Sequence, residues 1–361
     1  MHFAALYLAA TVVLTRAQSA SQYGWSILDY DNNQWSLELE RDVCVIGGGA
    51  SGIHAAVRLV DMNQTVAVVE QRDYLGGHTY TYVDPNIDLS FDIGVIVYQP
   101  WSIVRHYFSR FNIPLVNQTT LDPNKTPYPC WMYPDLRSYY VDFRYGTEQS
   151  YNPFPPGFEH ELEDVIGVLQ QYPSVLTSYN LPSPTPEDLY MPFGTFVDKY
   201  NLTALVRFNH FYSQGQADML NLPTLYIIKY FNLQDYLNIA TQSGWLSTAR
   251  YRNSELYEAA ASYIGRENVF LQSTVMSTSR NSSGPFKILI STASSNLTLL
   301  SCNKILSTIP PSLSNLANWD LTDNEYALFS RYRTSNGYWT ALARNISIPD
   351  DLCFTNVADR P

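Results

Sequence analysis

Asp-Val-Cys-Val-Ile-Gly-Gly-Gly-Ala-Ser-Gly, residues 42–52, is the stretch that decides the fold. The run after Asp42 is short, apolar and rich in β-branched residues, which is typical of a strand buried on both faces of a parallel sheet. The glycines indicate a tight turn, and the residues from Gly52 to Met62 have the pattern of a helix. A second buried strand, Thr65–Val69, completes a β-turn-α-β unit within about 30 residues.

Each glycine of this turn has a separate steric role. Gly47 permits the change from strand to helix, Gly49 leaves room for a pyrophosphate, and Gly52 lets the helix pack closely on the strand. The helix, with Ser51 in its first turn, directs free N–H groups and the positive end of its dipole toward the phosphates. The unit therefore predicts a dinucleotide-binding site.

Glu70 supports this interpretation from the end of the second strand. It follows Gly52 by 18 residues, where an acidic side chain accepts hydrogen bonds from a ribose diol. An acidic residue here also repels a 2′-phosphate, which disfavours NADP. A glycine-rich turn alone is a weak signal, but strand, helix, second strand and terminal glutamate in this order favour nucleotide binding.

The composition limits the classes of partner. With 361 residues the chain is long enough for two domains. The formal net charge of -11 works against nucleic acid as a partner, because affinity for a phosphate backbone comes from clustered Lys and Arg. A dinucleotide is different, since backbone N–H groups can neutralise its pyrophosphate. No pattern in the sequence specifies an oligomeric state.

The first 17 residues have the features of a secretory signal peptide. The apolar run from Phe3 to Leu14 precedes Thr15-Arg16-Ala17, which has small residues where a signal peptidase cleaves. A membrane anchor is the alternative, but these 12 apolar residues are fewer than the roughly 20 that span a bilayer, so we expect no stable membrane insertion. Seven N-x-Ser/Thr sequons fit a glycosylated protein that is secreted or lumenal: Asn63, Asn117, Asn124, Asn201, Asn281, Asn296 and Asn345.

The four cysteines have neither CxxC spacing nor histidines at metal-ligand spacing, so no zinc site is expected. Cys44 lies inside an apolar strand and is predicted to be a buried free thiol. Cys130, Cys302 and Cys353 could include one disulfide. The acidic residues 159–164 are typical of a solvated helix face and not of a metal site.

The remaining periodicity predicts an inserted domain. Helical spacing over residues 100–111 gives way to a segment rich in Pro, Tyr and Asn, in which residues 138–143 could form a strand. Helices are predicted further on, at Glu159–Gln171, Glu187–Tyr200 and Leu225–Ala240. We therefore expect a signal peptide over 1–17, a dinucleotide-binding domain over 18–111 and 251–361, and a mostly helical substrate domain over 112–250.

After residue 250 the pattern returns to a sheet. A helix over Glu255–Ile264 is predicted to be capped by Ser254 and ended by Gly265. Strands joined by hairpins are predicted at Val269–Thr278, Phe286–Thr292 and Leu297–Ile309.

Two further segments resemble the flavin-containing amine oxidase superfamily. They are Leu75-Gly76-Gly77-His78-Thr79, a glycine pair, and Phe91-Asp92-Ile93-Gly94-Val95, a D-x-G segment. The sequence GGHTYTY of residues 76–82 and the aromatic-rich remainder of the chain are similar to the fungal β-cyclopiazonate dehydrogenase-like branch. The resemblance implies an α/β fold, with a Rossmann-like FAD-binding domain of the glutathione-reductase type and an inserted, mostly helical substrate domain.

The resemblance also implies roles for individual residues. Gly76 and Gly77 would approach the phosphates or ribityl chain of FAD, and Gly94 with Val95 would lie near the isoalloxazine. His78 replaces the usual Arg, and is either a phosphate or flavin contact or a structural polar residue.

A returning strand would present its backbone to adenine at Val275. The segment Ile305–Pro311 is similar to a later strand that ends in a proline pair. Nothing after Pro311 resembles the superfamily's further glycine-rich segment, so the resemblance covers residues 42–311 and the C-terminal part of the usual fold is expected to be missing.

By resemblance, the function is removal of a hydride from a small organic metabolite by an FAD-dependent oxidoreductase of fungal secondary metabolism. No catalytic residue can be assigned, because a flavin enzyme needs few acid or base groups. Two alternatives remain open. One is an NAD-dependent dehydrogenase, and the other is a truncated, catalytically inactive flavin-fold binding protein.

Overall fold

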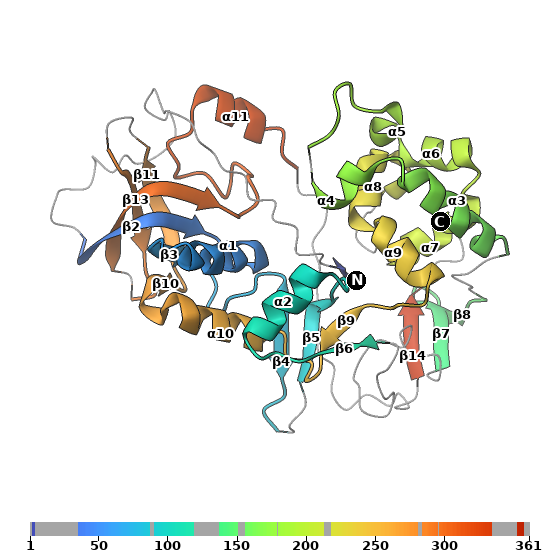
Figure 1. Cartoon of the computed structure of the whole chain (residues 1–361), viewed down its shortest axis with the longest axis horizontal. Helices are drawn as coiled ribbons and strands as arrows, with labels where there is room; N and C mark the ends of the chain where they lie inside the picture. Colours follow the sequence, from blue (N-terminus) through green and yellow to red (C-terminus); the bar gives the residue numbers. More distant parts are fainter. Residues whose placement is uncertain are drawn as a thin grey trace.

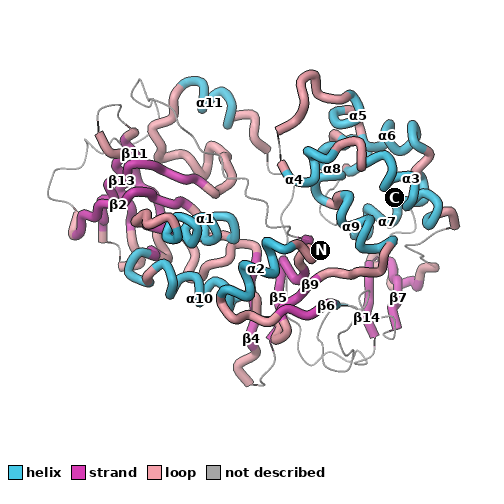
Figure 2. Tube along the Cα trace, viewed as in Figure 1, coloured by secondary structure: helices cyan, strands magenta, loops and turns pink. Residues whose placement is uncertain are grey.

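The computed structural model describes residues 2–3, 35–86, 90–118, 137–150, 156–178, 180–212, 218–280, 284–294, 296–333 and 352–356. Within them, a lobe built around a sheet lies beside a mostly helical lobe (Figure 1, Figure 2). The predicted signal peptide lies outside the described residues apart from His2–Phe3, which form β1. Cys130 and the sequons at Asn124, Asn281 and Asn345 also lie outside them.

The sheet lobe contains a six-stranded sheet of order β10-β3-β2-β13-β12-β11. Its parallel strands are β2 (Leu37–Ile46), β3 (Val66–Val69), β10 (Val269–Phe270) and β13 (Leu297–Ser307). The antiparallel strands β11 (Thr274–Ser279) and β12 (Phe286–Ser291) extend it as hairpins. This confirms the predicted Rossmann-like α/β fold, with β2 starting five residues earlier than the sequence indicated.

Both faces of this sheet are covered (Figure 1). The helices α1 (Ala50–Asp61) and α10 (Ser254–Ile264) pack on one face, where Val45 and Val68 contact Ile53 and other aliphatic side chains. The segment that leads into α11 (Asp323–Phe329) packs on the other face, with Leu316 and Trp319 against the sheet. Burial of β-branched residues on both faces accounts for the apolar runs in the sequence.

A second layer of strands joins the two lobes. The strand β5 (Ser90–Val97) pairs with β4 (Thr79–Val83) and β1, and α2 (Ser102–Arg110) follows it. Next to β5, β6 (Leu115–Asn117) pairs with β9 (Leu246–Thr248), whose Leu246 bridges Tyr98. The chain thus leaves and re-enters the sheet lobe through adjacent segments.

The helical lobe is built from short helices around an aromatic core that includes Phe158, Phe208, Phe231 and Tyr236. Its helices are α3 (Phe158–Leu169), α4 (Pro173–Thr177), α5 (Glu187–Tyr190), α6 (Phe193–Tyr200), α7 (Thr203–Tyr212), α8 (Thr224–Tyr230) and α9 (Leu233–Ala240). The short 3-10 helix η5 (Met219–Asn221) precedes α8, and η6 (Arg266–Asn268) follows α10. A small sheet of β14 (Leu352–Asn356), β7 (Arg137–Asp142) and β8 (Thr147–Glu148) lies below (Figure 2).

Two predicted helices are each divided in two, which corrects the sequence analysis. The helix expected over Glu187–Tyr200 is interrupted at Met191, whose extended backbone is required by the proline that follows it. The helix expected over Leu225–Ala240 is interrupted at Phe231, and Asn232 then caps α9 with Asp235 in a capping box. The helical spacing of apolar residues continues across both breaks, so the sequence pattern did not show them.

The predicted cap of α10 was also wrong. Asn253, not Ser254, is the N-cap residue, and no side chain of its own caps the helix. The backbone N–H of Ser254 instead donates to the hydroxyl of Thr81, 3.0 Å away. A hydroxyl from β4 has therefore taken the place of a local cap.

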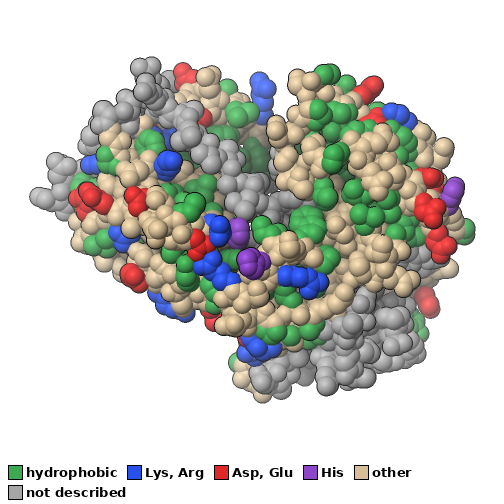
Figure 3. Space-filling model, in the orientation of Figure 1, with side chains coloured by type: hydrophobic (Ala, Val, Ile, Leu, Met, Phe, Trp, Pro, Cys, Tyr) green, Lys and Arg blue, Asp and Glu red, His purple; other side chains and the backbone are tan. Residues whose placement is uncertain are grey.

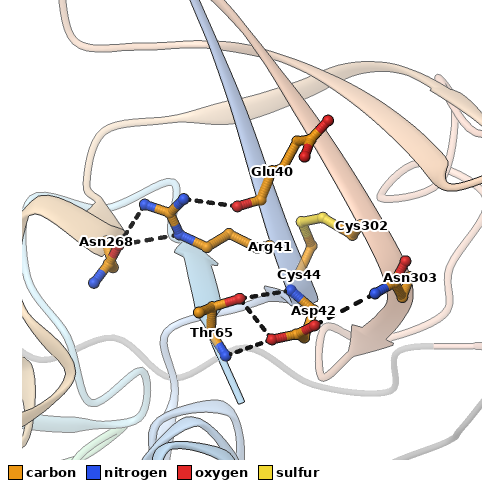
Figure 4. Close-up of a disulfide and its surroundings, with 8 residues drawn as sticks. All are labelled: Glu40, Arg41, Asp42, Cys44, Thr65, Asn268, Cys302 and Asn303. Carbon is orange, nitrogen blue, oxygen red and sulfur yellow. Dashed lines mark hydrogen bonds between the residues drawn. A yellow bond between two sulfur atoms is a disulfide. The ribbon is translucent and has the colours of Figure 1, made fainter. Parts of the chain in front are cut away.

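The prediction that Cys44 is a free thiol was wrong as well. The sulfur atoms of Cys44 and Cys302 are bonded, across the neighbouring strands β2 and β13 (Figure 4). Their Cα atoms are 5.9 Å apart although 258 positions separate them in the sequence. The pairing of β2 with β13 creates this proximity, which spacing along the chain cannot reveal.

Candidate dinucleotide-binding site

The site is centred on the turn between β2 and α1. Gly47 donates its N–H to the carbonyl of Val69, 2.9 Å away, which holds the turn against the end of β3. At α1, Gly49 occupies the N-cap position, no side chain caps the helix and its first turn contains no acidic residue. The N–H groups of this turn, that of Ser51 included, point beyond the helix end, as anion binding requires.

Gly52 allows this turn to close. A β-carbon at Gly52 would lie 2.0 Å from the carbonyl oxygen of Gly47 and 2.8 Å from the hydroxyl of Thr308. No side chain can be accommodated at that separation. The predicted role of Gly52 in close packing therefore agrees with the contacts at this position.

The two predicted glycine elements lie against each other. Gly76 donates its N–H to the carbonyl of Gly48 at 2.8 Å, and Gly76 also forms a parallel bridge with Gly49. A β-carbon on Gly77 would lie 2.9 Å from the Cα of Gly49. By contrast, a β-carbon on Gly49 would meet just one described atom within 4 Å, the Cα of Gly77 at 3.8 Å. The space above Gly49 is open, which leaves a cradle at the end of α1 beside Gly77.

Glu70 lies at this cradle with 7% of its surface exposed. One carboxylate oxygen accepts the N–H of Gly48 at 2.6 Å, and the other accepts the N–H of Arg72 at 2.8 Å. Each oxygen keeps a further lone pair with which it could accept a ribose hydroxyl. Glu70 thus fixes the glycine turn, a role that the sequence had not suggested beside the predicted ribose contact.

Arg72 was missed by the sequence analysis. Its guanidinium donates to the carbonyl of Gly77 at 2.9 Å and to the hydroxyl of Tyr74 at 2.5 Å. It also lies over the ring of Tyr74, 5.4 Å from the centroid. A basic residue two positions after the acidic strand end is the signal that could have identified it, because it adds positive charge beside an anion site.

His78 and Gly94 meet beyond the glycine pair. Gly94 has φ 88°, and a β-carbon on it would lie 2.2 Å from the carbonyl oxygen of His78 and 3.2 Å from its Cδ2. Val95 donates its N–H to the same carbonyl at 3.3 Å. Burial, and next the positive charge of Arg72, lower the pKa of His78, so the imidazole is neutral at pH 7. These residues continue the surface that starts at Gly49.

Val275 lies on the other side of the cradle. Ser273 donates its N–H to the carbonyl of Glu70 at 2.9 Å, which brings the start of β11 to the end of β3. The carbonyl of Val275 accepts from the side chain of Asn318 at 3.2 Å. Contacts therefore link the predicted cofactor-binding positions in series, from the start of β11 beside Val275, through Glu70, the glycine turn and the glycine pair, to Gly94 on β5.

A cavity of about 350 Å³ adjoins the turn at Ser51. Its walls come from the end of β13 and from the segment around α11, and include Ser307, Thr308, Trp319 and Phe329. The indole N–H of Trp319 is buried and has no hydrogen-bond partner. The cavity provides room beside the glycine turn.

Two other kinds of feature, a metal site and a membrane-spanning helix, concern the described part of the chain. It contains no group of three or more His, Cys, Asp or Glu side chains arranged to hold a metal ion. None of its helices combines the length and apolar character needed to cross a membrane. Of the acidic residues predicted to form a solvated face, Glu163 and Asp164 are exposed on α3, whereas Glu161 is partly buried and accepts the N–H of Leu205 at 3.0 Å.

Comparison with known proteins agrees with this geometry. Residues 45–111 match the NAD(P)-binding Rossmann-like domain. The FAD-dependent oxidoreductase oblC of Cochliobolus heterostrophus is 33% identical over 323 residues, which are 89% of this chain and 64% of that protein. The β-cyclopiazonate dehydrogenase of Aspergillus oryzae is 32% identical over 321 residues, 88% of this chain and 66% of the relative.

The chain therefore spans just under two thirds of the length of these relatives. Among solved structures, cyclohexylamine oxidase from Brevibacterium oxydans has a TM-score of 0.58 at 18% identity, covering 81% of this chain and 63% of that one. This likeness shows the fold alone. The homologues of this chain are fungal FAD-dependent oxidoreductases, as the glycine-pair and D-x-G segments had indicated.

Proposed function

We propose that the chain binds FAD and serves an oxidoreductase that removes a hydride from a small organic metabolite in fungal secondary metabolism. The observation that carries the proposal is the open cradle above Gly49, bounded by Gly77 and by the uncapped end of α1. The relatives named as FAD-dependent support FAD over NAD, although the matching domain family is described by NAD(P).

Different residues of the site would contact different parts of the cofactor. Gly47, Gly49, Ser51 and Gly52 hold the pyrophosphate at the end of α1, because N–H groups there face an anion without a competing cap. Glu70 accepts hydroxyls of the adenosine ribose, and Val275 offers its backbone to adenine.

Gly76, Gly77 and His78 would contact the phosphates or the ribityl chain, and Gly94 with Val95 would lie near the ring system. Arg72, held by the carbonyl of Gly77, adds a positive charge that attracts the diphosphate.

The chemistry follows from this arrangement. Bound FAD would accept a hydride from the substrate. The protein's part is to hold the donor carbon against the cofactor and to exclude water. Figure 3 shows a hollow between the two lobes, with hydrophobic side chains on both walls. An apolar metabolite would lose water on entering it, which favours binding.

The proposal is tested by the replacement of Gly49 with Ala. Gly49 has φ -70° and ψ 178°, and its added methyl group would have a nearest described neighbour 3.8 Å away, so the folded apoprotein should tolerate it. The same methyl group would occupy the space of the pyrophosphate. We expect wild-type protein to bind FAD in a fluorescence titration and Gly49→Ala to bind at least about tenfold more weakly, with an unchanged melting temperature.

Gly167→Ala is the matched control, because Gly167 lies on α3 with no described atom within 4 Å of an added β-carbon. It should bind FAD like wild type. Equal FAD affinity in Gly49→Ala and Gly167→Ala would contradict the proposed cradle. Binding of NAD but not FAD would indicate the dehydrogenase alternative, and FAD binding without substrate-dependent reduction would indicate the inactive binding protein.

We further propose that the protein is secreted or lumenal and glycosylated. The signal-like residues 1–17 support this, as does the disulfide between Cys44 and Cys302, since disulfides persist in oxidising compartments. The sequon residues Asn63, Asn201 and Asn296 are exposed, whereas Asn117 is partly buried and donates to the carbonyl of Ser243 at 2.6 Å. After expression in a fungal host, the protein should be found in the culture medium and should lose mass on N-glycosidase treatment. Retention of the protein in the cytosol would overturn the proposal.

A further inference from the structure

The strand β5 is the element that would lie closest to the reacting part of the cofactor. It carries Gly94 and Val95, which the proposed function places along the ring system, so its position must be fixed to within a fraction of an ångström. Thr79 of β4 pairs with Gly94, and β1, which lies within the predicted signal peptide, pairs with Val95, but both strands belong to the same three-stranded layer. Something outside that layer must hold the strand in place.

Asn253 makes three buried hydrogen bonds that do so. Its side-chain amide donates to the carbonyl of Val95 at 2.8 Å, and its backbone N–H donates to the carboxylate of Asp92 at 2.9 Å. Its side-chain oxygen accepts from the hydroxyl of Thr248 at 3.2 Å. Asn253 is fully buried. The side chain of Asn253 thus joins β5 to β9 directly before α10 begins.

The surroundings of Asp92 strengthen this connection. The oxygen that accepts from Asn253 also accepts from the hydroxyl of Thr81 at 2.5 Å. That hydroxyl in turn accepts the N–H of Ser254 at the start of α10. The second carboxylate oxygen of Asp92 is buried without a partner, so the side chain is held through one oxygen alone. The hydrogen bonds converge on the residues that flank Gly94 on both sides.

We infer that Asn253 is a positioning residue that fixes the carbonyl of Val95, and with it the Gly94–Val95 segment, against the flavin. The inference rests on the proposed function, because Asn253 would act on the cofactor only through Val95 and would not touch it. Asn253 lies outside every motif that the sequence analysis used. It acts where the chain returns from the helical lobe, so the inserted domain ends on a residue that orders the cofactor site.

The first experiment uses the apoprotein and does not depend on FAD. Asn253→Ala removes the donor to Val95, and hydrogen exchange of the segment 90–98 should become about tenfold faster, as expected for the loss of a buried hydrogen bond. Asn209→Ala is the matched control. Asn209 is 1% exposed and accepts from the hydroxyl of Tyr236 at 2.8 Å within the helical lobe. It should leave exchange in segment 90–98 unchanged.

The second experiment measures the cofactor. Asn253→Ala should bind FAD about tenfold more weakly and show a shifted visible flavin spectrum, while Asn209→Ala keeps the wild-type affinity and spectrum. If Asn253→Ala does not fold, Thr248→Val replaces it. That variant keeps the shape of the side chain and removes the hydroxyl that orients the Asn253 amide.

The outcomes separate the two ideas. If wild-type protein binds no FAD, the proposed function fails, and the exchange experiment alone tests whether Asn253 holds Val95. If wild type binds FAD while the Asn253 variant matches the Asn209 control in exchange, affinity and spectrum, the positioning role is overturned. A faster exchange in segment 90–98 together with a shifted spectrum supports it.

Discussion

The two lobes differ in where they bury charge. In the sheet lobe, the interior between sheet and helices is aliphatic. Of its buried charged residues, Glu70 and Arg280 follow the ends of β3 and β11, Glu325 lies in the first turn of α11, and Asp92 lies within β5. Glu70 and Asp92 border the candidate site. In the helical lobe, Asp235 is fully buried within an aromatic core.

The difference reflects the lengths of the elements. A sheet satisfies its own backbone groups, so its core needs only apolar side chains. Buried charge then lies at the edge of the sheet and not in its core. The short helices of the other lobe have many free ends that must find partners. Asp235 accepts the N–H of Asn232 at the start of α9, and Lys229 donates to the carbonyl of Ser178 near the end of α4. Buried carboxylates therefore cap helix starts in both lobes, Glu325 at α11 and Asp235 at α9, and the sheet lobe adds Glu70 beside the candidate site.

The largest expected effect concerns the sheet lobe, whose two halves come from distant parts of the chain. Replacement of both Cys44 and Cys302 by Ala should lower the free energy of unfolding by about 3–5 kcal/mol, because the disulfide closes a long loop in the unfolded chain. Urea denaturation of the oxidised protein and the variant measures this. Detection of two free thiols in the native protein by mass spectrometry would contradict the pairing.

A somewhat smaller effect is expected in the helical lobe from Asp235→Ala. The change leaves the N–H groups of Asn232, Gln99 and Trp245 without their acceptor, and should cost about 3 kcal/mol. Asp198→Ala, on the exposed face of α6, is the control and should stay within about 0.5 kcal/mol of wild type. Similar losses in both variants would show that the buried hydrogen bonds of Asp235 do not account for its effect.

The pH dependence of stability tests the charge at the binding edge. Burial raises the pKa of Asp92 to about 6, from 3.8, so the folded state holds this proton more tightly than the unfolded state. The contribution of the Asp92 carboxyl to the free energy of unfolding is therefore fully present below pH 3.8 and is lost as the pH rises through 6. Asp92→Asn keeps an acceptor oxygen and should flatten the decline between pH 4.5 and 7 by about 1–2 kcal/mol, measured by thermal unfolding.

The pKa of Glu325, held at about 2 beside Arg280, has the opposite effect on stability. It makes the free energy of unfolding fall as the pH drops, but only at more acidic pH. Burial also raises the pKa of Asp235 to about 6, so part of the slope should survive in Asp92→Asn. An unchanged slope in that variant would show that Asp92 does not titrate as described.

The smallest effect is expected from a glycine of the helical lobe. Gly167→Ala should raise the free energy of unfolding by about 0.5–1 kcal/mol, because a helical glycine without close neighbours gains from a methyl group. Gly52→Ala in the sheet lobe should instead prevent the strand-to-helix turn from forming. Chemical denaturation of both variants makes the contrast measurable, and a destabilised Gly167→Ala would argue against it.

The sheet lobe was predictable because its information is local. Gly47, Gly52 and Glu70 lie within one short unit, so their spacing specifies strand, turn, helix and strand together. The contact between Gly49 and Gly77 also follows once the order of elements is known. The bond between Cys44 and Cys302 does not, because it depends on which strand lies beside β2.

The helical lobe was less predictable for a related reason. Its periodicity showed helices but not their ends, since Asn232 and Met191 interrupt segments whose apolar spacing continues across them. The roles of Asn253 and Arg72 depend on contacts across the fold, with Val95 and with Gly77. Hydrogen bonds between distant segments leave no periodic trace in a sequence.

The strand order has a consequence for synthesis. During translation, β2 and β3 leave the ribosome long before β13, which pairs with β2 over nine residues. At about 5–20 residues per second, the 258 positions between Cys44 and Cys302 take on the order of tens of seconds to make. Throughout that interval one edge of β2 is unpaired and prone to wrong partners. The nascent chain would therefore depend on chaperones until β13 has been made. Joint oxidation of the Cys44 and Cys302 thiols by an external disulfide oxidant would mark the moment when the sheet closes.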